Sequence, residues 1–272
     1  MASIQVFLTR PQGRNGSVPQ RLRALGMVVH QLPALELLPL APSATLPRPE
    51  DYDVVVFVSR YAVQRYLSLL AASPAGAGCW PPGTIAATVG ASSAQALFES
   101  GIVPAACIVH PAANLPSQDS EALLAVMQER RLLMRRVLIV RGTEGRAWLA
   151  RKLAEGGVQT DFLPVYERAP ARWPAEAADA LAAALERPVR CVFLLTSSEG
   201  VRAVARRMGE LGLLEAWSQS AFVVLHERIG ATLQSVLASQ SGAGVRRLEL
   251  CMPDESSIVE AIRAVARSTA KP

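Results

Sequence analysis

Residues 140–168 read VRGTEGRAWLARKLAEGGVQTDFLPVYER, and this stretch decides the fold. An apolar run at residues 137–140 predicts a strand that ends at the basic turn Arg141-Gly142. The helical pattern that follows stops at the glycine pair 156–157, because glycine readily adopts the left-handed backbone that often ends a helix. The chain then becomes extended again. Strand, turn, helix and strand predict a βαβ unit, and open α/β sheets bind ligands at the turn after such a strand.

The same unit occurs once more, near the start of the chain. It aligns with residues 141–167 after a shift of 131 positions and without a gap. A second, less regular match joins residues 57–59 to residues 195–197, at a shift of 138. These matches predict an internal duplication whose halves differ by insertions and deletions. The aligned pairs of the first match include Arg10 with Arg141, Leu22 with Leu153, Gly26 with Gly157, Pro33 with Pro164 and Glu36 with Glu167.

The length and composition allow two compact domains. Half of the 272 residues are apolar and 19% are charged, which supports sizeable cores and argues against disorder. Predicted strands alternate with predicted helices, so we expect an α/β fold with mostly parallel sheets. No apolar run reaches the roughly 18 residues that a membrane span needs. The first residues also lack the basic region of a signal peptide, so we expect no membrane partner.

The four cysteines and three histidines are scattered along the chain. Without paired spacing, the cysteines fit a reducing compartment and supply neither a disulfide frame nor a zinc site. The histidines add no metal-binding constellation. We therefore expect a cytoplasmic protein without a bound metal.

The net charge of +5 comes almost wholly from arginine, since Lys152 and Lys271 are the only lysines. Codon bias in a GC-rich genome explains such a composition without any function. The functional alternative is an anionic ligand, because the guanidinium fork matches carboxylate and phosphate oxygens. Nucleic acid is not expected as a partner, because the basic residues do not form runs with interleaved aromatic residues.

Polar turns directly follow six of the predicted strands. Serine and threonine cap helices in most proteins, which is one explanation of these turns. Hydroxyls and free amides at helix N-termini also form anion sites, and we favour this second explanation because the turns fall into two matching sets. If the two sheets face each other, the turns line a cleft. The candidate binding residues are Thr9, Arg10, Ser59, Arg60, Gly90, Ser92, Ser93, Arg141, Gly142, Arg146, Thr196, Ser197, Ser198 and His226.

Tyr166 breaks the duplication, because the first repeat has Leu35 at that position. A structural tyrosine on a strand is one interpretation. The other is a phenol that donates a proton at the mouth of an anion site. Two interpretations also remain for His226, namely a capping or packed histidine and a catalytic histidine. We find no nucleotide-binding fingerprint, no Ser-His-Asp order and no paired carboxylates.

Taken together, these turns resemble the uroporphyrinogen-III synthase family. The resemblance covers nearly the whole chain in order, and each motif is weak alone. Two departures stand out: Val58 precedes Ser59 where the family often has threonine, and His226-Glu227-Arg228 replaces a small glycine/threonine pattern. The matching residues are Leu8 to Pro11, Phe57 to Ser59, Val89-Gly90 with Ser92-Ser93, Arg141-Gly142, Gly145-Arg146, Leu149, Leu153, Gly157, Val165 to Arg168, and Leu195 to Ser197.

The resemblance implies two doubly wound, parallel-sheet (flavodoxin-like) domains joined by a two-stranded linker, with the active site in a cleft between them. One domain is expected to combine residues 1–38 with 172–272, and the other to span 51–160. Residues 39–50 and 161–171 are then the linker strands. The family expectation for the oligomeric state is a monomer.

The resemblance also implies a reaction. The substrate is hydroxymethylbilane, a linear tetrapyrrole rich in carboxylates, which the enzyme cyclises with inversion of ring D and loss of water in haem biosynthesis. Such an enzyme is a lyase (a hydro-lyase) and needs no cofactor. Tyr166 matches the family's proposed catalytic tyrosine. The main alternative is a non-catalytic two-domain ligand-binding or sensor module for an anionic small molecule. A two-domain glycosyltransferase is a third reading, but this chain has no acidic metal-binding pair after a strand to support it.

Overall fold

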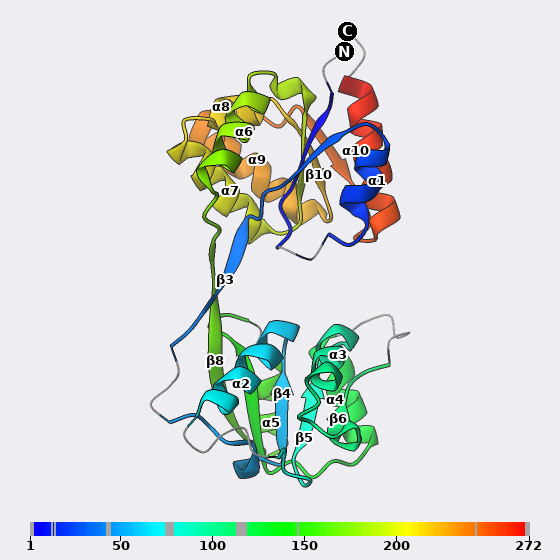
Figure 1. Cartoon of the computed structure of the whole chain (residues 1–272), viewed down its shortest axis with the longest axis vertical. Helices are drawn as coiled ribbons and strands as arrows, with labels where there is room; N and C mark the ends of the chain where they lie inside the picture. Colours follow the sequence, from blue (N-terminus) through cyan, green and yellow to red (C-terminus); the bar gives the residue numbers. More distant parts are fainter. Residues whose placement is uncertain are drawn as a thin grey trace. The chain divides into compact units, whose positions relative to one another are not determined.

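The structure is a computed structural model that describes residues 3–11, 13, 15–41, 45–73, 79–112, 119–145, 147–242 and 244–269. The chain divides into two compact units, each an alternation of strands and helices (Figure 1). Unit 1 consists of Met1–Glu36 with Ala169–Pro272, and unit 2 consists of Leu37–Arg168. The five strands of the unit 1 sheet pair in parallel, and so do five neighbouring strands of the unit 2 sheet, which confirms the predicted α/β class.

Unit 1 contains a five-stranded sheet in the order β11-β10-β9-β1-β2. Numbered by their order along the chain, these strands follow 2-1-3-4-5 from the β2 edge, which is the flavodoxin-like order. Strand residues face the two sides alternately, so Val6 and Leu8 pack on one face and Phe7 on the other. The strands are β1 (Gln5–Leu8), β2 (Val28–Gln31), β9 (Cys191–Leu195), β10 (Ala221–Val224) and β11 (Arg247–Leu250).

Helices cover both faces of this sheet, as a doubly wound fold requires. On one face lie α1 (Val18–Ala24) and α10 (Glu255–Thr269). The opposite face is covered by α6 (Ala175–Leu185), α7 (Ser198–Glu210), α8 (Leu214–Ser218) and α9 (Glu227–Ser241). A short 3-10 helix, η3 (Pro188–Arg190), precedes β9.

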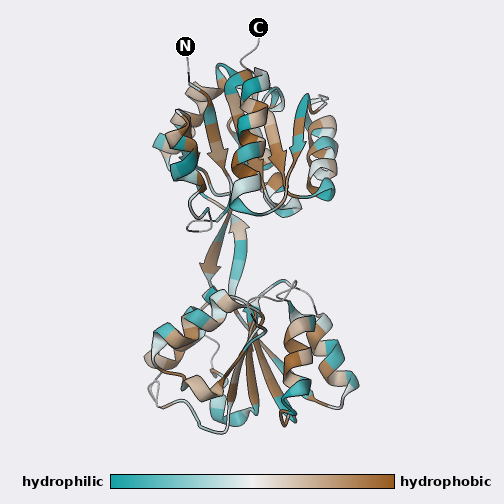
Figure 2. Ribbon diagram, turned by 90° about the vertical axis from the view of Figure 1, so that its right-hand side faces the viewer, coloured by the Kyte–Doolittle hydropathy of each residue, from teal (hydrophilic) through white to brown (hydrophobic). Residues whose placement is uncertain are grey.

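Unit 2 contains a six-stranded sheet in the order β3-β8-β7-β4-β5-β6. The apolar side chains of its strands are again divided between two helix-covered faces, and the strands in Figure 2 are mostly in the hydrophobic colour. Helices α2 (Arg60–Ala72) and α3 (Ala91–Ser100) cover one face, and α4 (Ser120–Glu129) and α5 (Trp148–Glu155) cover the other. The strands are β3 (Leu35–Pro39), β4 (Val54–Phe57), β5 (Ile85–Thr88), β6 (Ile108–Val109), β7 (Arg136–Gly142) and β8 (Gln159–Pro170), with 3-10 helices η1 (Pro49–Asp51) and η2 (Ala105–Cys107).

The strand registers of the two units match the shifts seen in the sequence. Strand β1 pairs with β2 at Gln5↔Val28, and β7 pairs with β8 at Arg136↔Gln159, which is the same register 131 positions later. The neighbouring strands β9 and β4 also correspond at the shift of 138. The five strands of unit 1 therefore lie side by side in the same order as their counterparts in unit 2. In unit 2 the chain reaches the β7–β8 pair last, whereas in unit 1 the equivalent β1–β2 pair comes first.

The segments β3 and β8 are neighbours in the six-stranded sheet, and the chain passes from one unit to the other through each of them. The Leu40 amide donates to Val165, and the Ala171 amide donates to Ala34. From the first of these hydrogen bonds to the second, the residue number falls in the β3 segment and rises in the β8 segment, so the two segments are antiparallel. The linker strands expected at 39–50 and 161–171 are instead observed as strands over Leu35–Pro39 and Gln159–Pro170.

None of the helices in the described ranges combines the length and the apolar composition required to cross a membrane.

A candidate active site at the strand ends of unit 2

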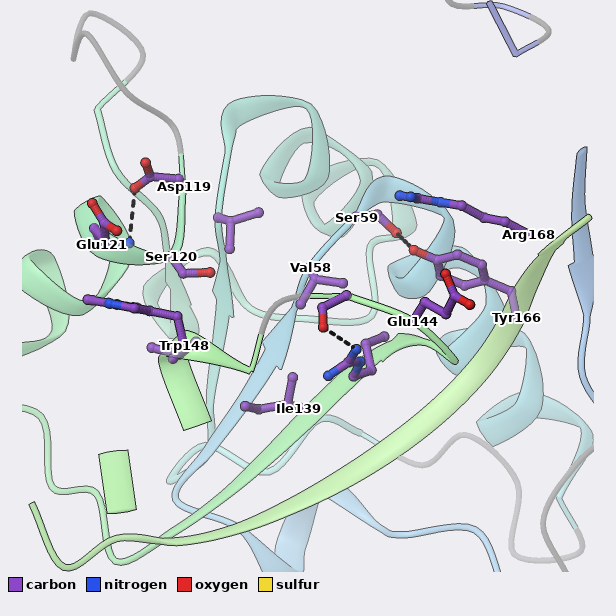
Figure 3. A pocket seen from close by; sticks show the side chains of 14 residues that line it. Val58, Ser59, Asp119, Ser120, Glu121, Ile139, Glu144, Trp148, Tyr166 and Arg168 are labelled. Carbon is purple, nitrogen blue, oxygen red and sulfur yellow. Dashed lines mark hydrogen bonds between the residues drawn. The ribbon is translucent and has the colours of Figure 1, made fainter. Parts of the chain in front are cut away.

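A cavity of about 490 Å³ lies at the carboxyl ends of the central strands of unit 2 (Figure 3). Strands β4 and β7 are adjacent, and the chain proceeds from β4 to one side of the sheet and returns through β7 on the other. Open α/β sheets bind ligands at such a reversal of strand order. The lining residues are Val58, Ser59, Val89, Asp119, Ser120, Glu121, Ile139, Arg141, Glu144, Gly145, Trp148, Leu149, Tyr166 and Arg168.

Tyr166 presents its hydroxyl at this cavity while its ring is packed in the core. The residue is only 4% exposed, and its hydroxyl lies 3.2 Å from Ser59 Oγ. The ring of Tyr61 stands edge-on to the Tyr166 ring, with 5.2 Å between the centroids. The phenol is therefore held in one orientation by apolar packing and by a polar contact at its tip.

A β-bulge sets the direction of the Tyr166 side chain. Arg141 is opposite Pro164, but the next residue, Gly142, is opposite Tyr166, so Val165 is the extra residue of β8. Bulges often redirect a side chain next to an active site. A Cβ atom on Gly142 would lie 2.8 Å from a carbon of the Tyr166 ring, so the ring occupies space that only glycine leaves open. The predicted binding residue Gly142 therefore has a steric role.

Arg141 holds the turn that follows β7. Its Nε donates to the Gly142 carbonyl at 3.0 Å, and its Nη2 donates to the Gly145 carbonyl at 2.9 Å. The guanidinium also lies 5.4 Å from the centre of the Phe162 ring. Because guanidinium has five N–H donors, these two bonds leave it able to bind an anion. The predicted residue Arg146 lies outside the described residues.

The other residues predicted from the turns of unit 2 do not line the cavity. The Arg60 Nη2 atom forms an ion pair with Glu99 at 2.6 Å, which joins α2 to α3. Gly90 occupies the N-cap position of α3. Ser92 is exposed and Ser93 is buried. Of the predicted residues, the structure brings Ser59, Arg141 and Tyr166 to the cavity.

Sequence reasoning missed six polar or aromatic residues that line the cavity. Arg168 follows Tyr166 by two positions on β8, and this period-2 spacing was an available signal. Asp119 is the N-cap of α4 and accepts the amides of Glu121 and Ala122 at 2.9 and 3.0 Å. Its place beside the cavity follows only from the strand order. The missed residues are Asp119, Ser120, Glu121, Glu144, Trp148 and Arg168.

The cavity combines groups of both charges. Asp119 and Glu121 lie with Trp148 on one side in Figure 3, and Tyr166 and Arg168 lie on the other. Guanidinium groups bind carboxylates, whereas carboxylates accept N–H donors and stabilise cations. The arrangement suits a ligand that carries both carboxylates and N–H groups. In the parts of the chain that the structure describes, no three His, Cys, Asp or Glu residues are placed to hold a metal ion.

The turns of unit 1 mainly serve local structure. The Thr9 hydroxyl is buried and donates to the Leu194 carbonyl at 2.6 Å. Arg10 Nη2 donates to the Pro253 carbonyl at 3.2 Å. Burial lowers the pKa of Arg10 below its ordinary value, although nearby Cys251 and Glu255 oppose that shift.

The strands β9 and β10 end in residues that cap the following helices. Ser197 caps α7 by accepting the Gly200 amide at 3.0 Å, and Thr196 beside it is half-buried. Ser198 Oγ accepts the Thr232 hydroxyl at 2.9 Å. His226 Nδ1 accepts the Arg228 amide at 3.1 Å and so caps α9. Substrate binding by the unit 1 turns stays a prediction.

The fold and the cavity define a class of two-unit, doubly wound α/β proteins with a polar site at the strand ends. Within this class, residues 17–248 match the sequence model of the family described as uroporphyrinogen-III synthase HemD. The chain belongs to this family.

The chain is also similar to individual proteins and solved structures. The uroporphyrinogen-III synthase of Salmonella typhimurium is 29% identical over 170 residues, which cover 61% of this chain and 65% of that relative. The uroporphyrinogen-III synthetase of Helicobacter pylori is 15% identical, covers 96% of this chain and 99% of its own, and has a TM-score of 0.60, which shows the fold. A mutant uroporphyrinogen III synthase of Thermus thermophilus is 16% identical, with coverages of 98% and 100% and a TM-score of 0.49.

Proposed function

We propose that this protein is a uroporphyrinogen-III synthase, a hydro-lyase of haem biosynthesis that cyclises hydroxymethylbilane with inversion of ring D and loss of water. The family match over residues 17–248 supports this function over a non-catalytic sensor module. The chemistry of the cavity supports it too, since the substrate carries pyrrole N–H groups and many carboxylates. The cavity offers Arg141 and Arg168 to carboxylates, and Asp119, Glu121 and Glu144 to N–H donors.

The observation that carries the proposal is the phenol of Tyr166, which lies at the cavity wall beside Ser59. Loss of the substrate hydroxyl needs a proton donor, and a phenol keeps its proton at neutral pH. Departure of water leaves a cationic azafulvene. Fixed carboxylates of the cavity would stabilise this charge as it develops.

The remaining task is to hold a flexible chain in the geometry that allows ring D to invert. Without an enzyme, closure gives the uninverted isomer, so orientation determines the product. We propose that the turns of both units bind substrate carboxylates. Arg10 and the amides at the start of α7 and α9 would supply donors in unit 1, as helix N-termini do for anions.

We also propose that the protein is a cytoplasmic monomer and that it works without a cofactor, a metal ion or nucleic acid. The four cysteines Cys79, Cys107, Cys191 and Cys251 are free, which fits a reducing compartment. Sedimentation of the purified protein would test the monomer.

The test of the activity is to add hydroxymethylbilane to the protein and to identify the porphyrin isomer after oxidation. We expect isomer III. If only isomer I forms, at the rate of a protein-free sample, the proposed function is wrong. Binding of hydroxymethylbilane without turnover would then favour the sensor module.

A further inference from the structure

The hydroxyl of Ser59 lies between a helix end and the phenol of Tyr166. Ser59 is the N-cap of α2, and its Oγ accepts the Ala62 amide at 3.1 Å. The same oxygen lies 3.2 Å from the Tyr166 hydroxyl. The capping contact is one of the two explanations that the sequence offered for this turn, whereas the contact with Tyr166 was not predicted.

The hydrogen-bonding capacity of serine gives these two contacts a direction. A hydroxyl has one proton to donate and two lone pairs that accept. The Ala62 amide is a donor only, so it uses one lone pair of Ser59. If the Ser59 proton goes to the phenol oxygen, the proton of Tyr166 remains for an acceptor in the cavity. If Tyr166 instead donates to Ser59, the phenol has no proton to give to a ligand.

We infer that Ser59 is a positioning residue for Tyr166: it donates to the phenol oxygen and thereby directs the phenol proton into the cavity, towards the leaving hydroxyl of the substrate. This inference rests on the proposed function. In the acid step, the Tyr166 proton moves to the hydroxyl oxygen, the C–O bond breaks, and water leaves with the bonding electrons. The Ser59 donor then stabilises the phenolate that remains.

A comparison with unit 1 shows that helix capping alone does not explain the contact between Ser59 and Tyr166. Ser197 caps α7 as Ser59 caps α2, so a serine at this position needs no phenol beside it. In unit 1, the positions of Tyr166 and Gly142 are occupied by Leu35 and Pro11. Unit 2 therefore has two linked differences. It has a phenol within reach of the capping serine and a glycine that leaves space for the phenol ring.

A double-mutant cycle separates positioning from capping. The variants are Ser59→Ala, Tyr166→Phe and the combination of both, assayed for isomer III formation. We expect Ser59→Ala to lower kcat about tenfold with little change in KM, because the proton donor is misdirected rather than lost. In the Tyr166→Phe background, Ser59→Ala should lower kcat no further. Ser59→Thr keeps the hydroxyl and should restore kcat.

Ser59→Gly controls for the helix cap, because glycine is an acceptable N-cap residue without a hydroxyl. It should lower kcat as much as Ser59→Ala while leaving the melting temperature closer to that of the parent. It also serves as the test variant if Ser59→Ala does not fold.

The inference is overturned if removal of the Ser59 hydroxyl leaves kcat unchanged. It is equally overturned if that removal lowers kcat by the same factor with tyrosine and with phenylalanine at position 166, because Ser59 then acts only as a cap. In both cases the parent protein still makes isomer III. Failure of the proposed function is a different result, since the parent protein itself would make none.

Discussion

The β1–β2 end of unit 1 and the β7–β8 end of unit 2 have the same strand register but different side chains where a ligand would bind. Unit 1 has Pro11 and Leu35, and unit 2 has Gly142 and Tyr166. The common register shows that the scaffold does not require the tyrosine. The tyrosine, the glycine that accommodates it and the serine beside it occur together only in unit 2. We therefore propose that the acid chemistry belongs to unit 2, and substrate binding by the unit 1 turns stays a prediction.

The largest effect is expected from removal of the Tyr166 hydroxyl. Tyr166→Phe should lower kcat about a hundredfold or more, which is the range of a lost general acid. The melting temperature should change little, because the ring and its contact with Tyr61 remain. Stopped-flow assay of isomer III formation measures the rate. Tyr61→Phe makes the same chemical change on the neighbouring ring and should stay near the parent, whereas full activity of Tyr166→Phe would exclude the tyrosine from the mechanism.

A methyl group at Gly142 should make unit 2 resemble unit 1 sterically. In Gly142→Ala, the new Cβ would lie 2.8 Å from the Tyr166 ring, so the ring must move. We expect kcat to fall roughly ten- to a hundredfold from this displacement. Overpacking should also lower the free energy of unfolding by about 1–3 kcal/mol.

The matched control for that change is Gly209→Ala. Gly209 lies in helix α7, and nothing would be within 4 Å of a Cβ atom there. Alanine favours a helix over glycine by up to about 1 kcal/mol, so this variant should be active and slightly more stable. Equal activity of Gly142→Ala and Gly209→Ala would contradict the steric role of Gly142.

The two aligned arginines should differ in their effect on substrate affinity. Arg141 lines the cavity, whereas Arg10 donates to the Pro253 carbonyl in unit 1. We expect Arg141→Gln to raise KM about tenfold, as the loss of a charge-assisted bond to a carboxylate would. Arg10→Gln should raise KM less. Steady-state kinetics of both variants measure the two increases in KM. A larger increase for Arg10→Gln would contradict the stronger role in substrate binding that we give to Arg141.

The smallest expected effect concerns a cross-strand pair at the opposite sheet end. His30 Nε2 is 2.8 Å from Gln5 Oε1 in unit 1, and the aligned pair in unit 2 is Arg136 with Asp161 at 3.0 Å. Burial, and then the charge of Arg23, lower the pKa of His30 below its ordinary value. The unfolded chain therefore takes up a proton at higher pH than the folded one. His30 stabilises the fold above pH of about 6.5, and this contribution declines as the pH falls further.

Denaturant unfolding at pH 7.5 and pH 5.5 measures the His30 contribution. The difference between these two pH values should be smaller in His30→Gln than in the parent protein. A difference of the same size in both proteins would show that His30 does not contribute to the pH dependence.

The sequence predicted the βαβ units well, because their signals are local. Unbroken β-branched runs, glycines at helix ends and the repeat at a shift of 131 are all visible without tertiary structure. Strand β8 begins two residues before the strand expected at 161–171, since the polar residues Gln159 and Thr160 give no apolar pattern there. The two-residue strand β6 is too short to give a pattern at all.

Less of the candidate site could be predicted, because its members meet through long-range pairing. Asp119 precedes α4 and Trp148 begins α5. These helices lie on the same face, and only the strand order brings both residues to the cavity with Tyr166. The Thr9 hydroxyl was expected to bind the substrate, but it donates to a carbonyl 185 residues away. The bulge after Arg141 likewise depends on the pairing of two strands, so the orientation of Tyr166 could not be read from the spacing of residues.

The most direct test of the account is a crystal structure of the protein with uroporphyrinogen III bound. We expect a macrocycle carboxylate at Arg141 or Arg168, and a pyrrole or bridging carbon facing the Tyr166 hydroxyl in the unit 2 cavity. A product bound elsewhere, with this cavity unoccupied and Tyr166 in contact only with Ser59, would contradict the assignment of the chemistry to unit 2.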